Sequence, residues 1–377
     1  MPPRVLHIVE TLGRGATENW LLRMLAHAKA TGAPVDWTFY CALAEAGPQA
    51  AHAVSLGAKV VTSPVPIGAK IAFVRALRGE LKSGRYDVLH SHHDLVSALY
   101  LGAAVGISLR RRLVHVHNAG EAVLTDNPLK RRVYKPILRQ GALLLADQIV
   151  SVSDHALDTF LGGRRRRPER DMVQYCGIDT SAFTGPAPDR RQFRLDLGLS
   201  ENAVILLFAG RMVAEKNPAF VVDVLLHLRK LESRAVAVFA GSGPDEEQVL
   251  QRAQGVGLTD QVRALGWRND LPDILRCADL FILPSPEQPM EGFGLAVVEA
   301  QLAGLRLLVS RGIADDPLLP NAIYRRLPLS DGPQAWAAAA AKLMGRPAPS
   351  SAEAIAALAA SPMAMDRSLS NLLALHA

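Results

Sequence analysis

Two cations and two carboxylates in the second half of the chain have the types and spacing to hold a phosphate-bearing ligand. Arg211 and Lys216 lie in the segment GRMVAEK, directly after a predicted strand at 203–209. Glu291 and Glu299 stand eight residues apart in EGFGLAVVE, where a predicted helix begins. Guanidinium and ammonium groups attract phosphates, and carboxylates accept hydrogen bonds from hydroxyl groups. The alternative for each residue is a solvated charge on a loop or on a helix face.

The segment between the two glutamates favours an anion site. At a helix start the first backbone amides lack partners within the helix, and the terminus carries about half a positive charge. Glu299 follows Glu291 by about two helical turns. Its apolar neighbours predict partial burial, so its carboxylate needs a hydrogen-bond partner, and sugar hydroxyls are suitable ones. The residues at this helix start are Gly292, Phe293, Gly294 and Leu295.

Alternating strands and helices must position these groups. The predicted strands of the first half are 5–9, 35–42, 59–64, 88–92, 113–117 and 148–153. The predicted helices between them are 18–30, 49–56, 71–82, 95–105 and 129–145. Apolar strands that alternate with helices predict a parallel sheet covered on both faces.

The pattern stops at TGPAP, residues 184–188, which predicts a linker, and then repeats. The second set of strands is 203–209, 235–240, 262–265, 280–284 and 305–310, with helices at 218–230, 245–255, 271–277 and 294–303. We therefore predict two α/β domains, 1–184 and 185–361. Helices at 335–345, 352–360 and 368–376 follow, and the last one, within about 362–377, has the option of packing back onto the first domain. Ligands of such sheets bind beyond the carboxyl ends of the strands, so two such edges are expected to face each other across a cleft.

Composition fits a globular protein and limits its environment. Of the 377 residues, 49% are hydrophobic and 21% are charged, which excludes a mostly disordered chain. Three cysteines exclude a disulfide framework and fit a reducing cytoplasm. No apolar run reaches the ~18 residues of a membrane-spanning helix. The start MPPRVLHIVE predicts a strand rather than a signal peptide.

The net charge of +6 is unevenly distributed. Residues 1–185 hold 23 Lys/Arg against 15 Asp/Glu, whereas residues 186–377 hold 19 against 21. A basic first half predicts an anionic partner. Nucleic acid is excluded because aromatic residues make up only 5% and no nucleic-acid module is evident. A dinucleotide fingerprint fails because Gly13 and Gly15 are followed by Glu18 where a third glycine is needed.

The motifs and their order resemble the retaining glycosyltransferases of family 4, which have the two-domain GT-B fold. In the second half the resemblance rests on GR with Lys216, GSGP at 241–244, GW at 266–267 and the paired glutamates around EGFG. In the first half it rests on DVLHSH at 87–92, VH at 116–117, VS at 152–153 and GID at 177–179. The first half and the tail segment LPLSDGPQAW are most similar to the subgroup that builds exopolysaccharides and capsules.

The resemblance implies an activity and a role for each residue. The reaction would move a hexose from a nucleotide diphosphate sugar to a glycan or lipid-linked acceptor, with retention at the anomeric carbon and without a metal or cofactor. Arg211 and Lys216 would hold the diphosphate, Glu291 the sugar hydroxyls and Glu299 the ribose, while His117 would lie beside the reacting sugar. The implied donor-site residues are Gly15, Gly210, Gly241, Trp267, Arg268, Gly292, Phe293, Gly294, Leu295 and Glu299.

The sequence departs from the family at two positions. Ala16 stands where the family's Gly-Gly-Ala-Glu run has its second glycine, which narrows the freedom of the backbone next to Gly15. Asn217 replaces the glycine that usually follows the lysine. Two other functions stay open, a sugar-nucleotide epimerase and a non-catalytic sugar- or lipid-binding paralogue. UDP is favoured over GDP by family frequency alone, and the sequence does not specify the acceptor, the linkage or the oligomeric state.

Two further clusters have a structural and a functional interpretation. His90, His92 and His93 with Asp94 could hold a metal, but we favour structural histidines because the resemblance implies none. His117 could equally be a core histidine. The basic runs 110–112, 130–135 and 164–167 could form a surface that contacts the anionic inner leaflet of a membrane, which would make the protein peripheral there. Their alternative is an ordinary solvated face.

Overall fold

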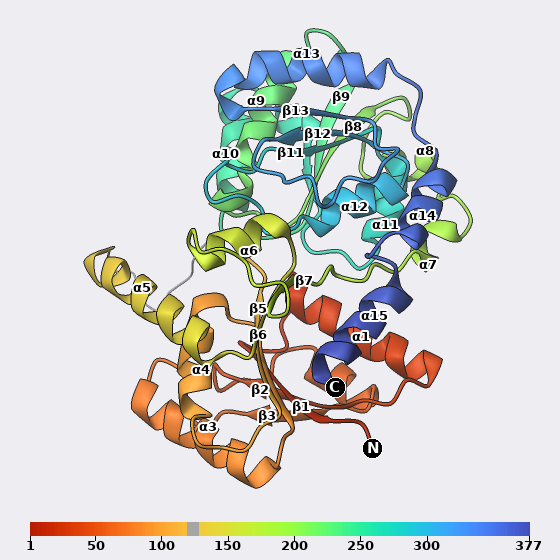
Figure 1. Ribbon diagram of the computed structural model, residues 1–377. Helices are drawn as coiled ribbons and strands as arrows, with labels where there is room; N and C mark the ends of the chain where they lie inside the picture. The colour runs from red at the N-terminus through yellow and green to blue at the C-terminus, as the bar shows by residue number, and fades with distance from the viewer. Residues whose placement is uncertain (119–127) are drawn as a thin grey trace. The chain divides into compact units, whose positions relative to one another are not determined.

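The computed structural model describes the backbone of residues 1–118 and 128–377, and the side chains of residues 1–118 and 132–377. The chain divides into two compact units (Figure 1). Unit 1 comprises Met1–Ile178 and Pro362–Ala377, and unit 2 comprises Asp179–Ser361. This division falls before the predicted linker at 184–188, where the short helix α7 (Ser181–Thr184) ends.

Unit 1 is a parallel sheet of seven strands in the order β3-β2-β1-β4-β5-β6-β7. Its strands are β1 (Arg4–Val9), β2 (Asp36–Cys41), β3 (Lys59–Thr62), β4 (Val88–Ser91), β5 (Arg111–Val116), β6 (Gln148–Ser151) and β7 (Asp171–Val173). Its helices are α1 (Ala16–Thr31), α2 (Ala50–Ser55), α3 (Lys70–Gly84), α4 (Ser97–Ala103), α5 (Pro128–Leu145), α6 (Asp154–Leu161) and α15 (Met365–His376). The last of these, α15, lies beside α1 (Figure 1).

Unit 2 is a parallel sheet of six strands in the order β10-β9-β8-β11-β12-β13. Its strands are β8 (Val204–Ala209), β9 (Ala235–Ala240), β10 (Val262–Ala264), β11 (Leu280–Leu283), β12 (Arg306–Ser310) and β13 (Tyr324–Leu327). Its helices after α7 are α8 (Arg190–Asp196), α9 (Ala219–Leu228), α10 (Glu246–Gly255), α11 (Leu271–Cys277), α12 (Leu295–Leu302), α13 (Gly332–Met344) and α14 (Ser351–Ala360).

The two sheets share a strand order that decides where ligands can bind. In each, the chain first builds outward in one direction and then restarts on the other side of the first strand, between β1 and β4 in unit 1 and between β8 and β11 in unit 2. Loops that leave the carboxyl ends of two such strands diverge and leave a crevice between them. The loops after β8 and β11 carry Arg211, Lys216 and Glu291, and Glu299 follows on α12.

The predicted α/β class is confirmed, and the central strands are buried on both faces as their apolar sequences indicate. Two edge strands, β7 and β13, were missed. Both are short, and the exposed or half-exposed arginines of β13 hide any strand pattern. All three cysteines are buried and unpaired. None of the helices in the described part of the chain has the length and apolar character needed to cross a membrane.

Candidate functional site

The carboxyl ends of β8 and β9 meet through glycines. Gly210 and Gly241 follow the two strands with φ of 147° and 140°, values that L side chains rarely adopt. A Cβ atom added to Gly241 would lie 2.0 Å from the carbonyl oxygen of Gly210, and one added to Gly243 would lie 2.2 Å from that of Met212. The two loops are therefore in backbone contact at the strand ends.

Replacing Gly241 with alanine tests this packing. We expect Gly241→Ala to destabilise unit 2 by about 2–4 kcal/mol, since the new methyl group meets backbone and the φ is unsuitable. The measurement is urea unfolding of the full chain. Gly255→Ala is the matched control, because a Cβ at that position, the last residue of α10, meets nothing within 4 Å. A variant at 241 as stable as the control would contradict the close contact.

Lys216 and Glu291 meet beside the loop after β8 although 75 residues separate them in sequence. The Lys216 Nζ lies 2.8 Å from the Glu291 Oε2, and the two side chains are only 14% and 19% exposed. The lysine side chain passes over Gly210, where a Cβ would lie 3.1 Å from its Cδ. Ion pairs this poorly hydrated are costly to leave half-formed, so each partner holds the other in place.

The start of α12 completes the cluster around Glu291. Gly294 precedes the helix with φ 86° and ψ 58°, and no side chain caps the first turn. The Glu291 Cγ lies 3.4 Å from the position of a Cβ on Gly294, so the carboxylate and the helix start are neighbours. Phe293 is buried and anchors the turn. An ammonium group and the positive end of a helix therefore lie next to one another, as a diphosphate would require.

Arg211 differs from Lys216 in being exposed. It follows Gly210 directly, and its side chain makes no hydrogen bond or ion pair with any residue that the structure describes. A guanidinium at the end of a strand, not engaged by a carboxylate of the protein, is available to bind an external anion. The structure thus places Lys216, Glu291 and Gly294 together and puts Arg211 at the adjoining strand end.

The other predicted residues of unit 2 lie on the neighbouring loop and on α12. Gly241 N–H donates to the Gly266 carbonyl over 2.8 Å, which holds the loop that carries Trp267 against the loop after β9. The Trp267 side chain is 41% exposed. Arg268 is paired with Asp270 over 2.7 Å and holds the pKa of that carboxyl below its usual value. Glu299 is half-buried on α12, between buried neighbours.

Gly312 is a site residue that the sequence did not reveal. Its carbonyl accepts a hydrogen bond from the Glu291 N–H over 2.9 Å, and a Cβ on it would lie 2.1 Å from the Pro286 carbonyl oxygen. It therefore fixes the backbone on which Glu291 stands. Its only signal was a glycine just after a strand. Such a glycine is common in turns and becomes informative only when its neighbour across the sheet is known.

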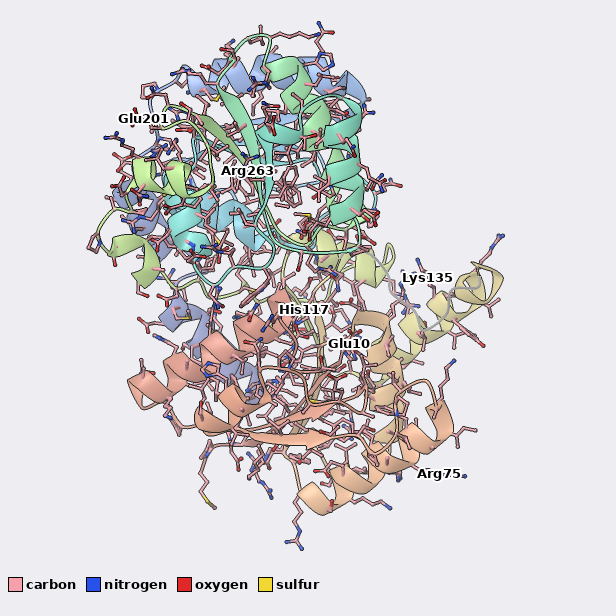
Figure 2. All side chains as sticks on the ribbon, turned by 180° about the vertical axis from the view of Figure 1, so that it is seen from behind. Glu10, Arg75, His117, Lys135, Glu201 and Arg263 are labelled. Atoms are coloured by element: carbon pink, nitrogen blue, oxygen red, sulfur yellow. The ribbon has the colours of Figure 1, made fainter. Side chains whose placement is uncertain are left out.

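In unit 1 the predicted residues lie at the carboxyl ends of β1 and β5. Gly15 is the residue before α1, with φ −70° and ψ 166°, and Ala16 is the first residue of that helix. His117, labelled in Figure 2, follows β5 and is half-buried. Its backbone N–H donates to Asp94 Oδ1 over 2.8 Å. Burial and the nearby His93 lower the pKa of His117 to about 3, so this imidazole is neutral near pH 7 and a weak base.

His117 belongs to a group of six imidazoles on one face of the unit 1 sheet, here called the histidine layer. Its members lie on β1, β4 and the adjoining position 92, β5 and the adjoining position 117, and α15. The residues are His7, His90, His92, His115, His117 and His376. Ring nitrogens of neighbouring members are 2.9–3.2 Å apart in four pairs. Of these six, the sequence analysis named His90, His92 and His117, and nothing local connects these to His7 and His376.

Several arginines of the basic runs of unit 1 are paired with carboxylates of the same unit. Arg110 and Arg112, at the start of β5, are paired with Asp87 and Asp147 over 3.2 and 3.5 Å. Arg166 is paired with two carboxylates of α6. On α5, Arg132 is exposed and Lys135 is half-buried (labelled in Figure 2), and the side chains at 130 and 131 of the predicted run lie outside the described residues.

Family models match both units. Residues 17–182 match the model described as Glycosyltransferase Family 4, and residues 189–314 match the one described as Glycosyl transferases group 1. The Bacillus subtilis protein EpsF, whose name assigns it as a glycosyltransferase, is 26% identical over 353 residues, which cover 91% of this chain and 89% of EpsF.

A second relative and a solved structure extend the comparison. An Escherichia coli enzyme named UDP-Gal:alpha-D-GlcNAc-diphosphoundecaprenol alpha-1,3-galactosyltransferase is 28% identical over 247 residues, 64% of this chain and 62% of that one. The chain thus spans less than two thirds of this enzyme. The crystal structure of Anabaena HepE in complex with UDP-glucose is similar to this chain, with a TM-score of 0.74 and 19% sequence identity. The match covers 99% of each chain and shows a likeness of fold.

Proposed function

Because the chain belongs to the family 4 glycosyltransferases of the GT-B fold, we propose that it transfers a hexose from a UDP-sugar to a glycan or lipid-linked acceptor during assembly of a cell-surface polysaccharide. The observation that carries the proposal is the Lys216–Glu291 pair beside the start of α12, with the unengaged guanidinium of Arg211 at the neighbouring strand end. The UDP complex of HepE and the UDP-Gal donor in the name of the E. coli relative favour UDP as the nucleotide.

In this proposal the bond between the anomeric carbon and the β-phosphate oxygen breaks as the acceptor hydroxyl oxygen forms its new bond to the same carbon. The hydroxyl proton passes to the departing diphosphate, and both events occur on one face of the sugar, which retains the anomeric configuration. Charge grows on the diphosphate as it leaves. We expect Arg211, Lys216 and the positive start of α12 to stabilise that charge, so the departure of the diphosphate needs no divalent metal.

The ion pair suggests how the donor is received. When a phosphate oxygen approaches Lys216, it competes with Glu291 for the ammonium group, and the glutamate then gains freedom to accept a sugar hydroxyl. The half-buried surroundings strengthen both interactions. The exposed Trp267 side chain, beside the loop after β9, offers an apolar surface for the base, and Glu299 on the next turns of α12 offers a carboxylate for the ribose hydroxyls.

A thermal-shift panel of UDP, GDP, ADP and the corresponding sugar nucleotides tests the donor. A ligand present at 100 times its dissociation constant stabilises the folded chain by about 2.7 kcal/mol, so we expect UDP compounds to raise the melting temperature by about 5 °C or more. Consumption of the UDP-sugar only in the presence of an acceptor fraction distinguishes transfer from epimerisation. A panel without any shift would contradict the proposal. A shift with GDP compounds alone would mean that the donor nucleotide is GDP and not UDP.

We also propose that the protein works at the inner face of a membrane, held there by α5. This helix lies at the edge of unit 1 (Figure 1) and exposes Val133, Ile137 and Leu144 by 51%, 60% and 71%. Residues four and eleven apart share one helix face, so the three form an apolar stripe. Arg132 and Lys135 lie on other faces of the same helix, at about 100° and 200° from Val133. An exposed apolar stripe on a helix that also carries cations suits the surface of an anionic bilayer.

Sedimentation with lipid vesicles tests this association. We expect the chain to bind vesicles that contain phosphatidylglycerol, to bind pure phosphatidylcholine weakly, and to lose binding as salt rises. The double variant V133S/I137S should lose at least tenfold in affinity. Val54→Ser, which changes an equally exposed valine on α2, is the control. Equal binding by the double variant and the control would rule out α5 as the docking helix.

A further inference from the structure

The histidine layer leaves ring nitrogens of three of its members without partners in the interior of unit 1. His7 Nε2, His115 Nε2 and His376 Nδ1 are buried and make no hydrogen bond with any described residue. Buried polar atoms are almost always paired, and each unpaired one costs on the order of 1–3 kcal/mol. Three such atoms in one layer therefore require an explanation.

The histidines of the layer cannot supply a hydrogen-bond partner for every one of their own ring nitrogens. His376 Nε2 lies 3.0 Å from His90 Nδ1, and His90 Nε2 lies 3.2 Å from His115 Nδ1, so the three rings form a chain. A neutral imidazole has one N–H and one bare nitrogen. Whichever way the hydrogen bonds run, one end of the chain keeps an N–H without an acceptor and the other end a bare nitrogen without a donor.

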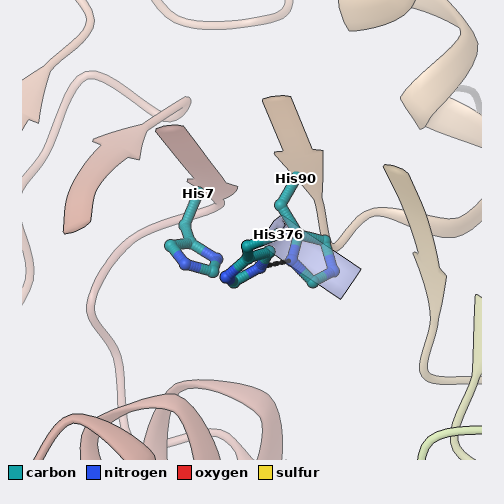
Figure 3. Close-up of side chains that lie close together, drawn as sticks. All are labelled: His7, His90 and His376. Carbon is teal, nitrogen blue, oxygen red and sulfur yellow. Dashed lines mark hydrogen bonds between the residues drawn. The ribbon is translucent and has the colours of Figure 1, made fainter. Parts of the chain in front are cut away.

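Three of these rings surround one point (Figure 3). His7 and His90 are paired positions on the adjacent strands β1 and β4, so their side chains leave the same face of the sheet. His376 reaches them from α15. One ring nitrogen of each of the three lies within 4.8 Å of those of the other two. Zn–N bonds of about 2.1 Å in a tetrahedral site put nitrogens about 3.4 Å apart, so small side-chain shifts would close the site.

We propose that His7, His90 and His376 bind a divalent ion of the zinc class, and that the ion fastens α15 to the unit 1 sheet. This ion lies apart from the Lys216–Glu291 site and takes no part in the transfer reaction. Three imidazoles with a water molecule as the fourth ligand are a donor set that zinc accepts.

The hydrogen bonds already present provide the outer support that such a site needs. A metal-binding histidine usually donates its other N–H to a neighbour. His7 Nδ1 lies 3.0 Å from His92 Nε2, so His7 binds the ion through its unused Nε2 and donates from Nδ1. His90 binds through Nδ1 and donates from Nε2 to His115. The ion takes the place of the proton now shared by His90 Nδ1 and His376 Nε2, and His376 then carries its proton at Nδ1.

The second trio that lies close together, His90, His92 and His115, is a poorer site. Both nitrogens of His92 and both of His90 already face other rings of the layer. An ion there would break more hydrogen bonds than it replaces. In the trio with His7 and His376, the ligand atom His7 Nε2 is uncommitted, and only the hydrogen bond between His90 and His376 is replaced, which is why the inference rests on it.

Cobalt and zinc titrations of the full chain, stripped with a chelator, test the site. We expect one Co²⁺ per chain with the visible d–d bands of a tetrahedral site, displaced by one equivalent of Zn²⁺. X-ray absorption of the zinc form should show three imidazole neighbours. Zinc should also raise the melting temperature by about 5 °C or more at 100 times its dissociation constant and slow hydrogen exchange in α15. These readouts need no variant.

Two variants locate the ion. His376→Gln and His7→Gln should each weaken Co²⁺ binding at least 100-fold and abolish the tetrahedral bands, while His52→Gln, on the neighbouring α2 of the same unit, should leave both unchanged. Absence of a stoichiometric Co²⁺ spectrum in the wild-type chain would overturn the proposal. So would a spectrum that survives both variants, since the ion would then lie elsewhere. UDP-sugar transfer by the chelated chain is a separate result, so failure of the metal site leaves the proposed function standing.

Discussion

Replacing Lys216 with methionine lowers kcat for hexose transfer by about 100- to 1,000-fold, the range found when one preorganised donor to a developing negative charge is removed. The ammonium group lies 2.8 Å from Glu291 and beside the start of α12, where the diphosphate is proposed to leave. Because the charge on the diphosphate grows during the reaction, the loss falls on kcat more than on KM. The measurement is steady-state release of UDP in the presence of acceptor.

Two further variants distinguish an effect on catalysis from an effect on folding. Lys230→Met removes an exposed lysine that follows α9 and should leave kcat unchanged. The double variant K216M/E291Q removes the unpaired carboxylate that the single variant leaves half-buried, so it should recover stability without recovering kcat. If the double variant regained most of the activity, Lys216 would serve only to neutralise Glu291, and its proposed role at the diphosphate would be wrong.

Acidification of the metal-free chain unfolds unit 1 near pH 5.5 while unit 2 stays folded. Burial lowers the pKa of seven histidines of unit 1, to about 4 for His93 and about 3 for His117 and His376. In the unfolded chain each ring takes up a proton near pH 6.5. The unfolded state therefore binds more protons between these values, and stability is lost as the pH falls. The seven residues are His7, His90, His92, His93, His115, His117 and His376.

The size of the effect follows from the number of rings. At pH 5.5, one unit below 6.5, each ring that stays neutral in the folded state lowers the free energy of unfolding by about 1.4 kcal/mol. Seven such rings lower it by roughly 10 kcal/mol, which is as much as the whole stability of a typical domain. Asp94 acts in the opposite direction, because burial raises its pKa to about 6, but it is one group against seven. Unit 2 has a single histidine, His227, and its α9 position is not buried.

Hydrogen exchange followed by mass spectrometry, with a chelator present, measures the two units separately. Peptides of unit 1 should lose protection between pH 6.5 and 5, and peptides of unit 2 should keep it. His115→Leu removes one titrating ring and should move the transition to lower pH, whereas His52→Gln should not. Protection of β1 and β4 that persists at pH 5 would contradict the neutral, buried state of the layer.

The sequence by itself determined the alternating architecture and the general place of the chemistry. Apolar runs and helical stretches depend on neighbouring residues, so their periodicity can be read locally, and it correctly gave two parallel sheets. The rule that ligands bind at the carboxyl ends of strands then directed attention to Arg211, Lys216 and Glu291. Short edge strands such as β7 were not predicted, because three residues are too few to show a recognisable periodicity.

Tertiary structure alone decided which of these groups meet. Restarting the sheet beside its first strand puts β8 next to β11 and β1 next to β4. This strand order brings Lys216 to Glu291 across 75 residues, and the packing of α15 onto unit 1 brings His376 to His90 across 286. Hydrogen bonds between strands and between side chains depend on proximity in space, and nothing in the local sequence encodes that proximity. The contacts of Gly312 and the unsatisfied histidine layer therefore became visible only in the folded chain.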